Sequence, residues 1–481
     1  MPRRTKIVAT LGPATDAKHV LDEMIQAGMD VVRVNFSYGT HEDHIKRAES
    51  VRNRARSHGH QVGVLADLQG PKIRIERFKE GMIQLEENDN FIFDTALSAD
   101  AGNRERVGVT YKSLQDDVSR GDTLLLDDGL LVLWVEEVQG TEVRCRVVVG
   151  GRLTNSKGIN RLGGGLSAAS ITEKDREDIK VAAAMEADYI AVSFPRCADD
   201  IHEARELLRA AGGHGCIVAK IERAEALDAL EEIIEASDAV MIARGDLGVE
   251  IGDAELPAVQ KRIIRVARSH DRVVITATQM MQSMVENPIP TRAEVFDVAN
   301  AVIDGTDAVM LSAETAAGRY PARVIEAMDR ICAGAERQRS VSAAEHRINK
   351  RFDRTDEAIA KAAIYTANSL GVKAIAALTE SGATALWMSR ISSGIPIFAM
   401  TRLVETRRKV TLYRGVYPVS FDVTTPDHAT VNKEAIDELV RRGAVRDGDL
   451  VIITKGDLMG VHGGTNAMKI IRVGEHEIME Q

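Results

Sequence analysis

The stretch Val240–Glu250, VMIARGDLGVE, is an apolar run that breaks into a charged residue on either side of a glycine. Glycine and aspartate commonly end strands, so Arg244-Gly245-Asp246 can be interpreted as a plain strand-to-turn boundary. An Arg-Gly-Asp adhesion tripeptide is a second interpretation, which chance occurrence of so short a motif disfavours. A third is the catalytic end of a strand, where Gly245 gives access to the backbone and Asp246 offers an oxygen to a metal ion.

Polar side chains also stand near the ends of other apolar runs. Residues two apart in a strand share a face, so Arg33, Asn35 and Ser37 are expected on one face, opposite Val34 and Phe36. The same spacing pairs Lys220 with Glu222 and Thr276 with Thr278, while Asp67, Asp246 and Glu314 lie near the carboxyl ends of their own runs.

These residue types suggest a particular chemistry if they converge. Carboxylates with no histidine or cysteine nearby suit a hard cation, so Glu222 and Asp246 predict a Mg²⁺ or Mn²⁺ site. The cations of Arg33, Arg74 and Lys220 suit phosphate and carboxylate groups. Each residue alone has a plainer interpretation, because a carboxylate such as Asp67 or Glu314 can be a helix N-cap or a surface group. The joint pattern favours an active site.

Eight short runs rich in β-branched residues must position these side chains. Amphipathic, helix-like segments lie between most of them, and such alternation predicts a parallel sheet closed into a (β/α)₈ TIM barrel, an α/β fold. Active sites of such barrels lie at the carboxyl ends of the strands. The runs are 6–12, 31–37, 62–68, 189–194, 216–222, 239–245, 273–279 and 308–314.

The third and fourth runs are separated by a stretch too long for one crossover helix. Residues 70–170 contain alternating strand patterns and turns such as Asp128-Gly129, which predict an inserted all-β lid domain. The barrel is then expected at 1–69 and 171–340. Beyond a polar linker, strand and helix patterns alternate again and predict a C-terminal α/β domain at 345–481.

Composition excludes several classes of protein. The 481 residues are 44% apolar and carry a net charge of −10, which argues against a nucleic-acid binder. The four cysteines (Cys145, Cys197, Cys216, Cys332) have no metal-like spacing and are expected to be reduced. Neither a secretory signal nor an 18-residue apolar run is present, so a cytoplasmic protein without a membrane segment is expected.

Longer motifs carry a family resemblance. RRTKIVATLGPA, RVNFSYG, DLQGPKIR, VAKIERAEA, ARGDLGVEIG, TATQMMQSM and DGTDAVMLSAETAAGRYP occur in the order found in pyruvate kinases. The chain resembles that family from about residue 3 to its C-terminus. The resemblance implies transfer of the phosphoryl group of phosphoenolpyruvate to ADP, giving pyruvate and ATP in the final step of glycolysis. It also implies a lid on the barrel, an effector-binding C-terminal domain and a homotetramer.

The resemblance also implies roles for individual residues. Glu222 and Asp246 correspond to the ligands of the divalent metal, and Lys220 to the lysine beside the transferring phosphoryl group. Other roles follow in the same way: Arg33 and Arg74 meet phosphate groups; Asn35, Ser37, Arg74 and Lys157 line the nucleotide side; Gly245, Asp246 and Thr278 cradle the substrate carboxylate; and Ser312 and Glu314 deliver a proton through water.

Two segments depart from the better-known family pattern. Potassium-dependent relatives resemble DTKGPEIR where this chain has DLQGPKIR, so Leu68 and Lys72 replace a hydroxyl residue and a glutamate. The Lys72 ammonium, near Asn35, Ser37 and Asp67, is expected to substitute for K⁺, as in bacterial potassium-independent members.

The second departure concerns the effector loop. The family binds an effector phosphate at the loop that here comprises Thr379, Ser381, Gly382, Ala383 and Thr384, and many members have arginine in place of Ala383. A sugar monophosphate or AMP is therefore expected as the activator, in preference to fructose 1,6-bisphosphate. A plain N-cap turn is the alternative interpretation.

Two other functions fit the same fold. A metal-dependent enolising lyase or aldolase would need neither Lys157 nor a nucleotide site. A catalytically inactive sugar-phosphate sensor is disfavoured because Lys220, Glu222, Asp246 and Thr278 are all present.

Overall fold

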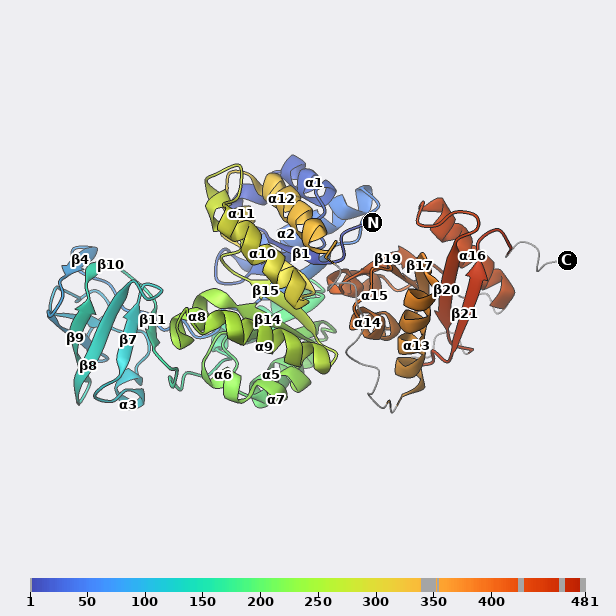
Figure 1. Ribbon diagram of the computed structural model, residues 1–481. Helices are drawn as coiled ribbons and strands as arrows, with labels where there is room; N and C mark the ends of the chain where they lie inside the picture. The colour runs from blue at the N-terminus through green and yellow to red at the C-terminus, as the bar shows by residue number, and fades with distance from the viewer. Residues whose placement is uncertain (1, 339–351, 353, 423–427, 458–462, 476–481) are drawn as a thin grey trace.

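Eight parallel strands of the computed structural model close into a barrel (Figure 1). Lys6 pairs with Ala308, which joins the first strand of the barrel to the last. The (β/α)₈ barrel predicted from the eight apolar runs of the sequence is therefore confirmed. Each strand ends before the last residue of the sequence run that predicted it. The strands are β1 (Lys6–Thr10), β2 (Val31–Asn35), β3 (Gly63–Asp67), β12 (Tyr189–Val192), β13 (Cys216–Ile221), β14 (Ala239–Ala243), β15 (Val273–Ala277) and β16 (Ala308–Leu311).

Helices connect these strands and cover the outside of the barrel. Three of them begin with a reciprocal capping box, which satisfies amides of the first turn: Thr40 with Asp43, Thr172 with Asp175, and Thr291 with Glu294. The connecting elements are η1 (Pro13–Thr15), α1 (Lys18–Gln26), α2 (His41–Ser57), α4 (Glu173–Ala184), α5 (Ala198–Ala210), α6 (Glu225–Asp228), α7 (Leu230–Ala236), α8 (Arg244–Ile251), α9 (Leu256–Ser269), η2 (Gln282–Val285), α10 (Arg292–Asp304), α11 (Ala313–Ala316) and α12 (Pro321–Ala335).

A separate group of strands is inserted between β3 and β12. They form a six-stranded sheet, in the order β11-β7-β8-β9-β5-β6, and the two-stranded pair β10-β4. All pairs are antiparallel except β5 with β6. The elements are β4 (Met82–Leu85), β5 (Asn90–Asp94), β6 (Arg106–Gly108), the short helix α3 (Leu114–Asp117), β7 (Thr123–Leu126), β8 (Leu131–Gln139), β9 (Glu142–Val149), β10 (Gly151–Thr154) and β11 (Ile159–Arg161). This is the predicted β lid.

The C-terminal part contains a five-stranded sheet in the order β19-β18-β17-β20-β21, parallel except for β21. Lid and C-terminal part lie at opposite ends of the barrel (Figure 1). The elements are α13 (Thr355–Leu370), β17 (Ala374–Leu378), α14 (Ala383–Ser389), β18 (Ile397–Thr401), α15 (Val404–Lys409), η4 (Val410–Leu412), β19 (Val416–Ser420), α16 (His428–Arg441), β20 (Leu450–Lys455) and β21 (Ala467–Arg472).

The structure describes the whole chain except residues 1, 339–351, 353, 423–427, 458–462 and 476–481. The domain boundaries expected at 340, 345 and 481 therefore lie outside the described residues, and the boundary near residue 70 stays a prediction. Within the described part, no helix is long and apolar enough to cross a membrane.

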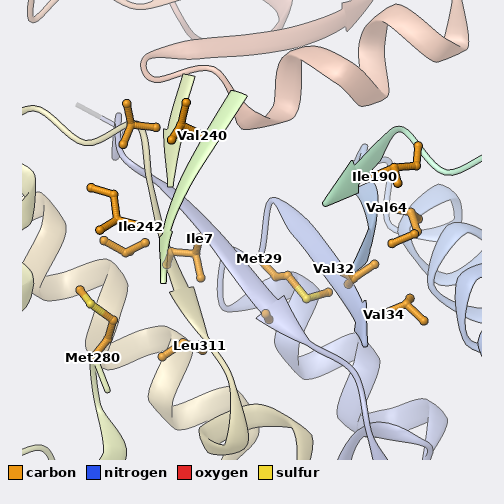
Figure 2. Close-up of a cluster of buried hydrophobic side chains, with 14 of the residues drawn as sticks. Ile7, Met29, Val32, Val34, Val64, Ile190, Val240, Ile242, Met280 and Leu311 are labelled. Carbon is orange, nitrogen blue, oxygen red and sulfur yellow. The ribbon is translucent and has the colours of Figure 1, made fainter. Parts of the chain in front are cut away.

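Alternate residues of each barrel strand belong to two different cores. Val32, Val34, Val240 and Ile242 pack with Ile7 and Leu311 in the layer between strands and helices (Figure 2). Their neighbours in sequence point into the barrel, where Val31, Leu65, Val218 and Met241 form a second cluster. Positions two apart in a strand share a face. Arg33, Asp67 and Lys220 therefore point into the barrel, like the apolar residues two positions before them.

The C-terminal domain closes the amino-terminal end of the barrel. Ile375 and Ala399 of its sheet belong to the same apolar cluster as the barrel interior. Lys6 Nζ donates to the carbonyl of Val416 at 2.7 Å, and Arg390 pairs with Asp307 where both side chains are fully buried. Among the residues that the structure describes, the carboxyl end of the barrel, on the side of the lid, is the end left open for a site.

Candidate active site

A cavity of about 310 Å³ lies at the carboxyl ends of the barrel strands, beneath the lid. Arg33 and Asn35 from β2, Asp67 from β3 and Lys220 from β13 line it. Ser37, Lys72, Arg74, Glu222 and Asp246 line it as well, together with lid residues that include Asp128, Gly158 and Asn160. Nine of the residues singled out in the sequence are therefore brought together.

Lys220 is the centre of a buried charge cluster. Its Nζ lies 2.9 Å from Glu222 Oε1 and 3.2 Å from Asp67 Oδ1, and it donates to Ser193 Oγ at 2.6 Å. On the other side of Asp67, Arg33 Nε donates to Oδ2 at 2.6 Å. Asp67 and Glu222 are each only 1% exposed. Two cations and two carboxylates thus neutralise one another away from water.

The cluster keeps Lys220 and Asp67 charged. Burial lowers the pKa of Lys220, but Asp67 and Glu222 raise it more, so the pKa lies above its usual value. Burial raises the pKa of Asp67, and the charges of Lys220 and Arg33 overcome that effect and hold it below its usual value. The ammonium of Lys220 therefore stays positive over the physiological pH range.

Glu222 and Asp246 differ from Asp67, because the pKa of each lies above its usual value. Burial raises the pKa of Glu222 to about 7, and repulsion by Asp246 adds to the increase although Lys220 opposes it. Burial also raises the pKa of Asp246, and repulsion by Asp128 adds to the increase although Lys220 opposes it. Lys220 therefore offsets the charges of these two carboxylates only in part, and a bound cation would supply the remainder.

The donor set fits a hard divalent cation. Glu222 and Asp246 offer oxygen atoms to the same cavity, and the described residues contain no group of three His, Cys, Asp or Glu side chains that could hold a metal alone. Mg²⁺ is commonly bound by one or two carboxylates, with water and substrate oxygens completing its octahedron. Glu222 and Asp246 therefore suit a metal that shares its coordination with a substrate.

The turn after β2 and the loop after β3 meet at one side of the cavity. Ser37 N donates to Asn35 Oδ1 at 3.0 Å, and Lys72 Nζ donates to the carbonyl of Ser37 at 3.3 Å. Burial lowers the pKa of Lys72, and the charges of Arg74 and Lys174 lower it further. The hydrogen bond nevertheless places the Lys72 side chain beside the Ser37 turn.

Arg244 and Asp246 point in different directions, which answers the question raised by their motif. Arg244 is buried, with Nη1 2.7 Å from Asp297 Oδ1 and Nη2 donating to the carbonyl of Thr278 at 2.7 Å. Asp246 lines the cavity from the first turn of α8, where a carboxylate is favoured by the helix dipole. The arginine is a structural anchor and the aspartate faces the site.

Several expected residues do not line this cavity. Gly245 N donates to Thr278 Oγ1 at 2.8 Å, and Lys157 Nζ lies 2.7 Å from Asp127 Oδ1. Glu314, 1% exposed, accepts from the amide of Ser312 at 2.6 Å and from that of Met281 at 3.2 Å. The roles of these residues stay predictions.

Thr276 does not converge on the site as expected. Its Oγ1 donates to Thr306 Oγ1 at 2.9 Å, and its neighbour Val274 belongs to the core between strands and helices. Thr276 therefore lies on the outer face of β15. Thr278 follows the end of the strand and has a φ of 66°, in the left-handed region. Its side chain therefore does not share the direction of the Thr276 side chain.

The residues expected at the effector loop lie in the C-terminal domain, between β17 and α14. Thr379 Oγ1 accepts from Gly382 N at 2.9 Å, and Ser381 Oγ accepts from Ala383 N at 3.3 Å. Thr384 Oγ1 lies 2.9 Å from Thr465 Oγ1. Two hydroxyls of the loop therefore cap the turn themselves.

Sequence reasoning missed other residues that line the cavity. Ser193 binds Lys220, and the amide of Phe194 donates to Glu222 Oε2 at 2.8 Å. Both follow β12 directly, so the criterion of a polar residue at a strand end applied to Ser193 as well. The lid residue Asp128 and the barrel residues Arg223, Glu225 and Glu250 have no comparable signal, because they approach the site from separate elements.

Comparison with known proteins identifies close relatives. The family model "Pyruvate kinase, barrel domain" matches residues 2–325, and "Pyruvate kinase, alpha/beta domain" matches residues 357–471. Over 475 residues the chain is 56% identical to pyruvate kinase II of Salmonella typhimurium, a match that covers 98% of this chain and 99% of that one. It is 54% identical over 458 residues to a pyruvate kinase of Haemophilus influenzae, covering 94% and 96%.

A solved structure has the same fold. The crystal structure of a pyruvate kinase from Cryptosporidium parvum superposes with a TM-score of 0.92 at 33% identity, covering 98% of this chain and 96% of that one.

The metal assignment predicts an effect that needs no turnover assay. Asp246→Asn removes one of two anionic donors, so the affinity for Mn²⁺ should fall by about tenfold or more. Free Mn²⁺ is measured by electron paramagnetic resonance during titration. Asp253→Asn, at an exposed residue that follows α8, is the matched control and should bind like the wild type. Equal affinity of both variants would contradict the assignment.

Proposed function

The chain belongs to the pyruvate kinase family, and from that premise we propose which of its side chains carry out the transfer of a phosphoryl group from phosphoenolpyruvate to ADP. The enzyme forms pyruvate and ATP, the final step of glycolysis, as its relatives' names and the identity over nearly the whole chain establish. Members of the family generally need Mg²⁺. A lyase, an aldolase or an inactive sensor is not favoured.

The buried ammonium of Lys220 is the observation that carries the proposal. Phosphoryl transfer depends on positioning and on stabilising the charge of the phosphoryl oxygens, more than on a nucleophile from the protein. Lys220 is held by Asp67 and Glu222 and directed at the cavity, so its charge is available without reorganisation. Arg33, fixed by Asp67, supplies a second cation for the phosphate.

Other residues are proposed to orient the substrates. Gly245, Asp246 and Thr278 receive the carboxylate of phosphoenolpyruvate, and the 2.8 Å bond from the amide of Gly245 to Thr278 Oγ1 shows that these two donors lie side by side. Asn35, Ser37, Arg74 and Lys157 meet the nucleotide. Lys157 belongs to the lid, whose approach over the cavity would keep water from competing with ADP.

Glu222 and Asp246 would hold the Mg²⁺ or Mn²⁺ ion, which supplies positive charge to the enolate oxygen and to phosphate oxygens when bound. The methylene carbon of the enol form then takes up a proton through water near Ser312 and Glu314. This role is supported by the Ser312 hydroxyl, which is buried and has no hydrogen-bond partner among the described residues.

Replacement of Lys220 tests the function and the role together. Lys220→Met should lower kcat by on the order of 10³-fold or more, because it removes charge stabilisation of the transition state. Pyruvate formation from phosphoenolpyruvate and ADP with Mg²⁺, coupled to lactate dehydrogenase, measures it. Lys261→Met, at an exposed lysine on α9, is the control. A Lys220→Met variant with near wild-type kcat would exclude the role.

Lys72 is proposed to replace a monovalent cation. Its ammonium donates to the Ser37 carbonyl at 3.3 Å, while Asp67 is already neutralised by Arg33 and Lys220. Leu68, at the position of a hydroxyl residue in potassium-dependent relatives, is 2% exposed and has no side-chain oxygen. A tethered charge therefore provides the electrostatic effect of K⁺ without binding it.

Potassium independence follows from this proposal. Activity with Mg²⁺ and tetramethylammonium should nearly equal activity with K⁺ at the same ionic strength. A stimulation by K⁺ of about tenfold or more, worth roughly 1.4 kcal/mol, would contradict it. The double variant Leu68→Thr, Lys72→Glu should depend on K⁺.

We also propose activation by a sugar monophosphate or AMP at the loop Thr379–Thr384. Support comes from the family resemblance and from Lys409, whose Nζ donates to the Ser381 carbonyl at 3.2 Å and brings a cation to the loop. Titration of sugar phosphates and AMP at sub-saturating phosphoenolpyruvate should increase the rate. If none of these compounds activates the enzyme, the effector proposal fails.

A homotetramer in the cytoplasm remains the proposed state of the enzyme. Ile289 and Phe296, 71% and 69% exposed, lie before and on α10, where a second copy of the chain would cover them. Light scattering of the purified chain measures the mass, and a monomer at working concentration would overturn the proposal.

A further inference from the structure

The segment from Phe36 to His41 forms the nucleotide side of the proposed site and links β2 to α2. Both of its ends are tied to α4, a helix that follows the lid in sequence. At its beginning, the carbonyl of Phe36 accepts from Lys174 Nζ at 2.8 Å. At its end, His41 Nε2 lies 2.8 Å from Asp178 Oδ1. The turn that carries Ser37 is therefore held between two fixed points.

Asp178 takes part in both contacts, because it binds His41 directly and also binds Lys174, the residue that holds Phe36. Its Oδ2 accepts from Lys174 Nζ at 2.5 Å, while its Oδ1 faces His41. The Asp178 side chain is fully buried, whereas those of Lys174 and His41 are 44% and 50% exposed. A buried carboxylate needs its partners, so this geometry persists only while both contacts are made.

The same helical turn also fixes the neighbouring loop. Asp175 Oδ1 accepts from the amide of Gly70 at 3.0 Å, while its Oδ2 accepts from the amide of its own N-cap residue, Thr172. Gly70 has a φ of 65°, and a Cβ there would lie 2.7 Å from Cβ of Ser193. The first turn of α4 thus anchors both the Ser37 turn and the loop that leads to Lys72.

We propose that Lys174 and Asp178 are positioning residues for the nucleotide, because they set the place of the Ser37 turn without touching the substrate. Neither residue lines the cavity, so direct contact does not explain an effect. Lys174 binds a backbone carbonyl, and Lys72 binds the next one along the chain, that of Ser37. Two ammonium groups therefore hold consecutive peptide units.

The effect should be selective for one substrate. Lys220 and Glu222, on the phosphoenolpyruvate side, are held by Asp67, Ser193 and Phe194. In the described part of the chain, none of these three residues forms a hydrogen bond or ion pair with Lys174 or Asp178. The turn and the cluster share a bond, from the amide of Phe36 to the carbonyl of Asp67 at 2.9 Å. Because that bond uses the backbone of Asp67 and not its carboxylate, loss of the Lys174 anchor would displace the Ser37 turn and leave the ion pairs of Asp67 with Arg33 and Lys220 in place. A general loss of stability would affect both substrates alike. The inference rests on the proposed nucleotide role of Asn35, Ser37 and Arg74.

Lys174→Met is the test, since methionine keeps the length of the chain and removes the ammonium. The KM for ADP should rise by about tenfold, the usual cost of one charge-assisted hydrogen bond, while the KM for phosphoenolpyruvate changes less than about twofold. Lys174→Arg should restore most of the affinity for ADP. Lys180→Met, on the same helix, is the control: its Nζ lies 2.7 Å from Glu177 and both side chains are exposed.

Calorimetry measures the binding of ADP with Mg²⁺ to the same variants and to Arg74→Met. The result distinguishes a failure of the proposed nucleotide side from a failure of the positioning role. If Arg74→Met binds ADP like the wild type, the proposed nucleotide side is wrong. If Arg74→Met loses affinity and Lys174→Met does not, the positioning role is wrong. Equal increases of both KM values in Lys174→Met would likewise overturn it.

Discussion

Arg33, Asp67, Lys220 and Glu222 lie in contact at the carboxyl end of the barrel, and the need to pair these charges governs the arrangement around them. Moving one such ion into a low-dielectric interior costs about 20 kcal/mol in the idealised limit. The cluster avoids that cost because three different strands or strand ends bring opposite charges within 3.2 Å of one another. Asp246 then adds a third carboxylate against the two cations of the cluster, which makes the site receptive to a divalent cation.

A closed barrel is the scaffold that makes this pairing possible. Arg33, Asp67 and Lys220 are inward-facing residues of β2, β3 and β13, and the ring closure determines how far apart these strands lie. The C-terminal domain seals the other end, where Arg390 and Asp307 form a second buried pair. Polar groups of the interior can therefore meet solvent and substrates only on the side of the lid.

The two sides of the cavity are supported differently. The phosphoenolpyruvate side depends on side chains that pair with one another directly, as Lys220 does with Glu222. The nucleotide side depends on backbone carbonyls of a short turn, which Lys72 and Lys174 hold from separate elements. A turn has no sheet ladder to fix its carbonyls, so side chains from outside must do so.

The sequence by itself determined the strands, their order and the family. The apolar runs located all eight barrel strands, although not their last residues, and period-two spacing correctly placed Arg33 with Asn35 and Lys220 with Glu222 on shared faces. Parallel strands are apolar on both faces, however, so spacing shows which residues share a face and not which face is inside. Thr276 was therefore misplaced, since only closure of the barrel turns it toward Thr306. The tertiary structure likewise decided that Arg244 and Asp246 point in different directions, and that Lys174 binds Phe36 across 138 residues. Contacts between distant segments have no local pattern, because they arise only when packing brings the elements together.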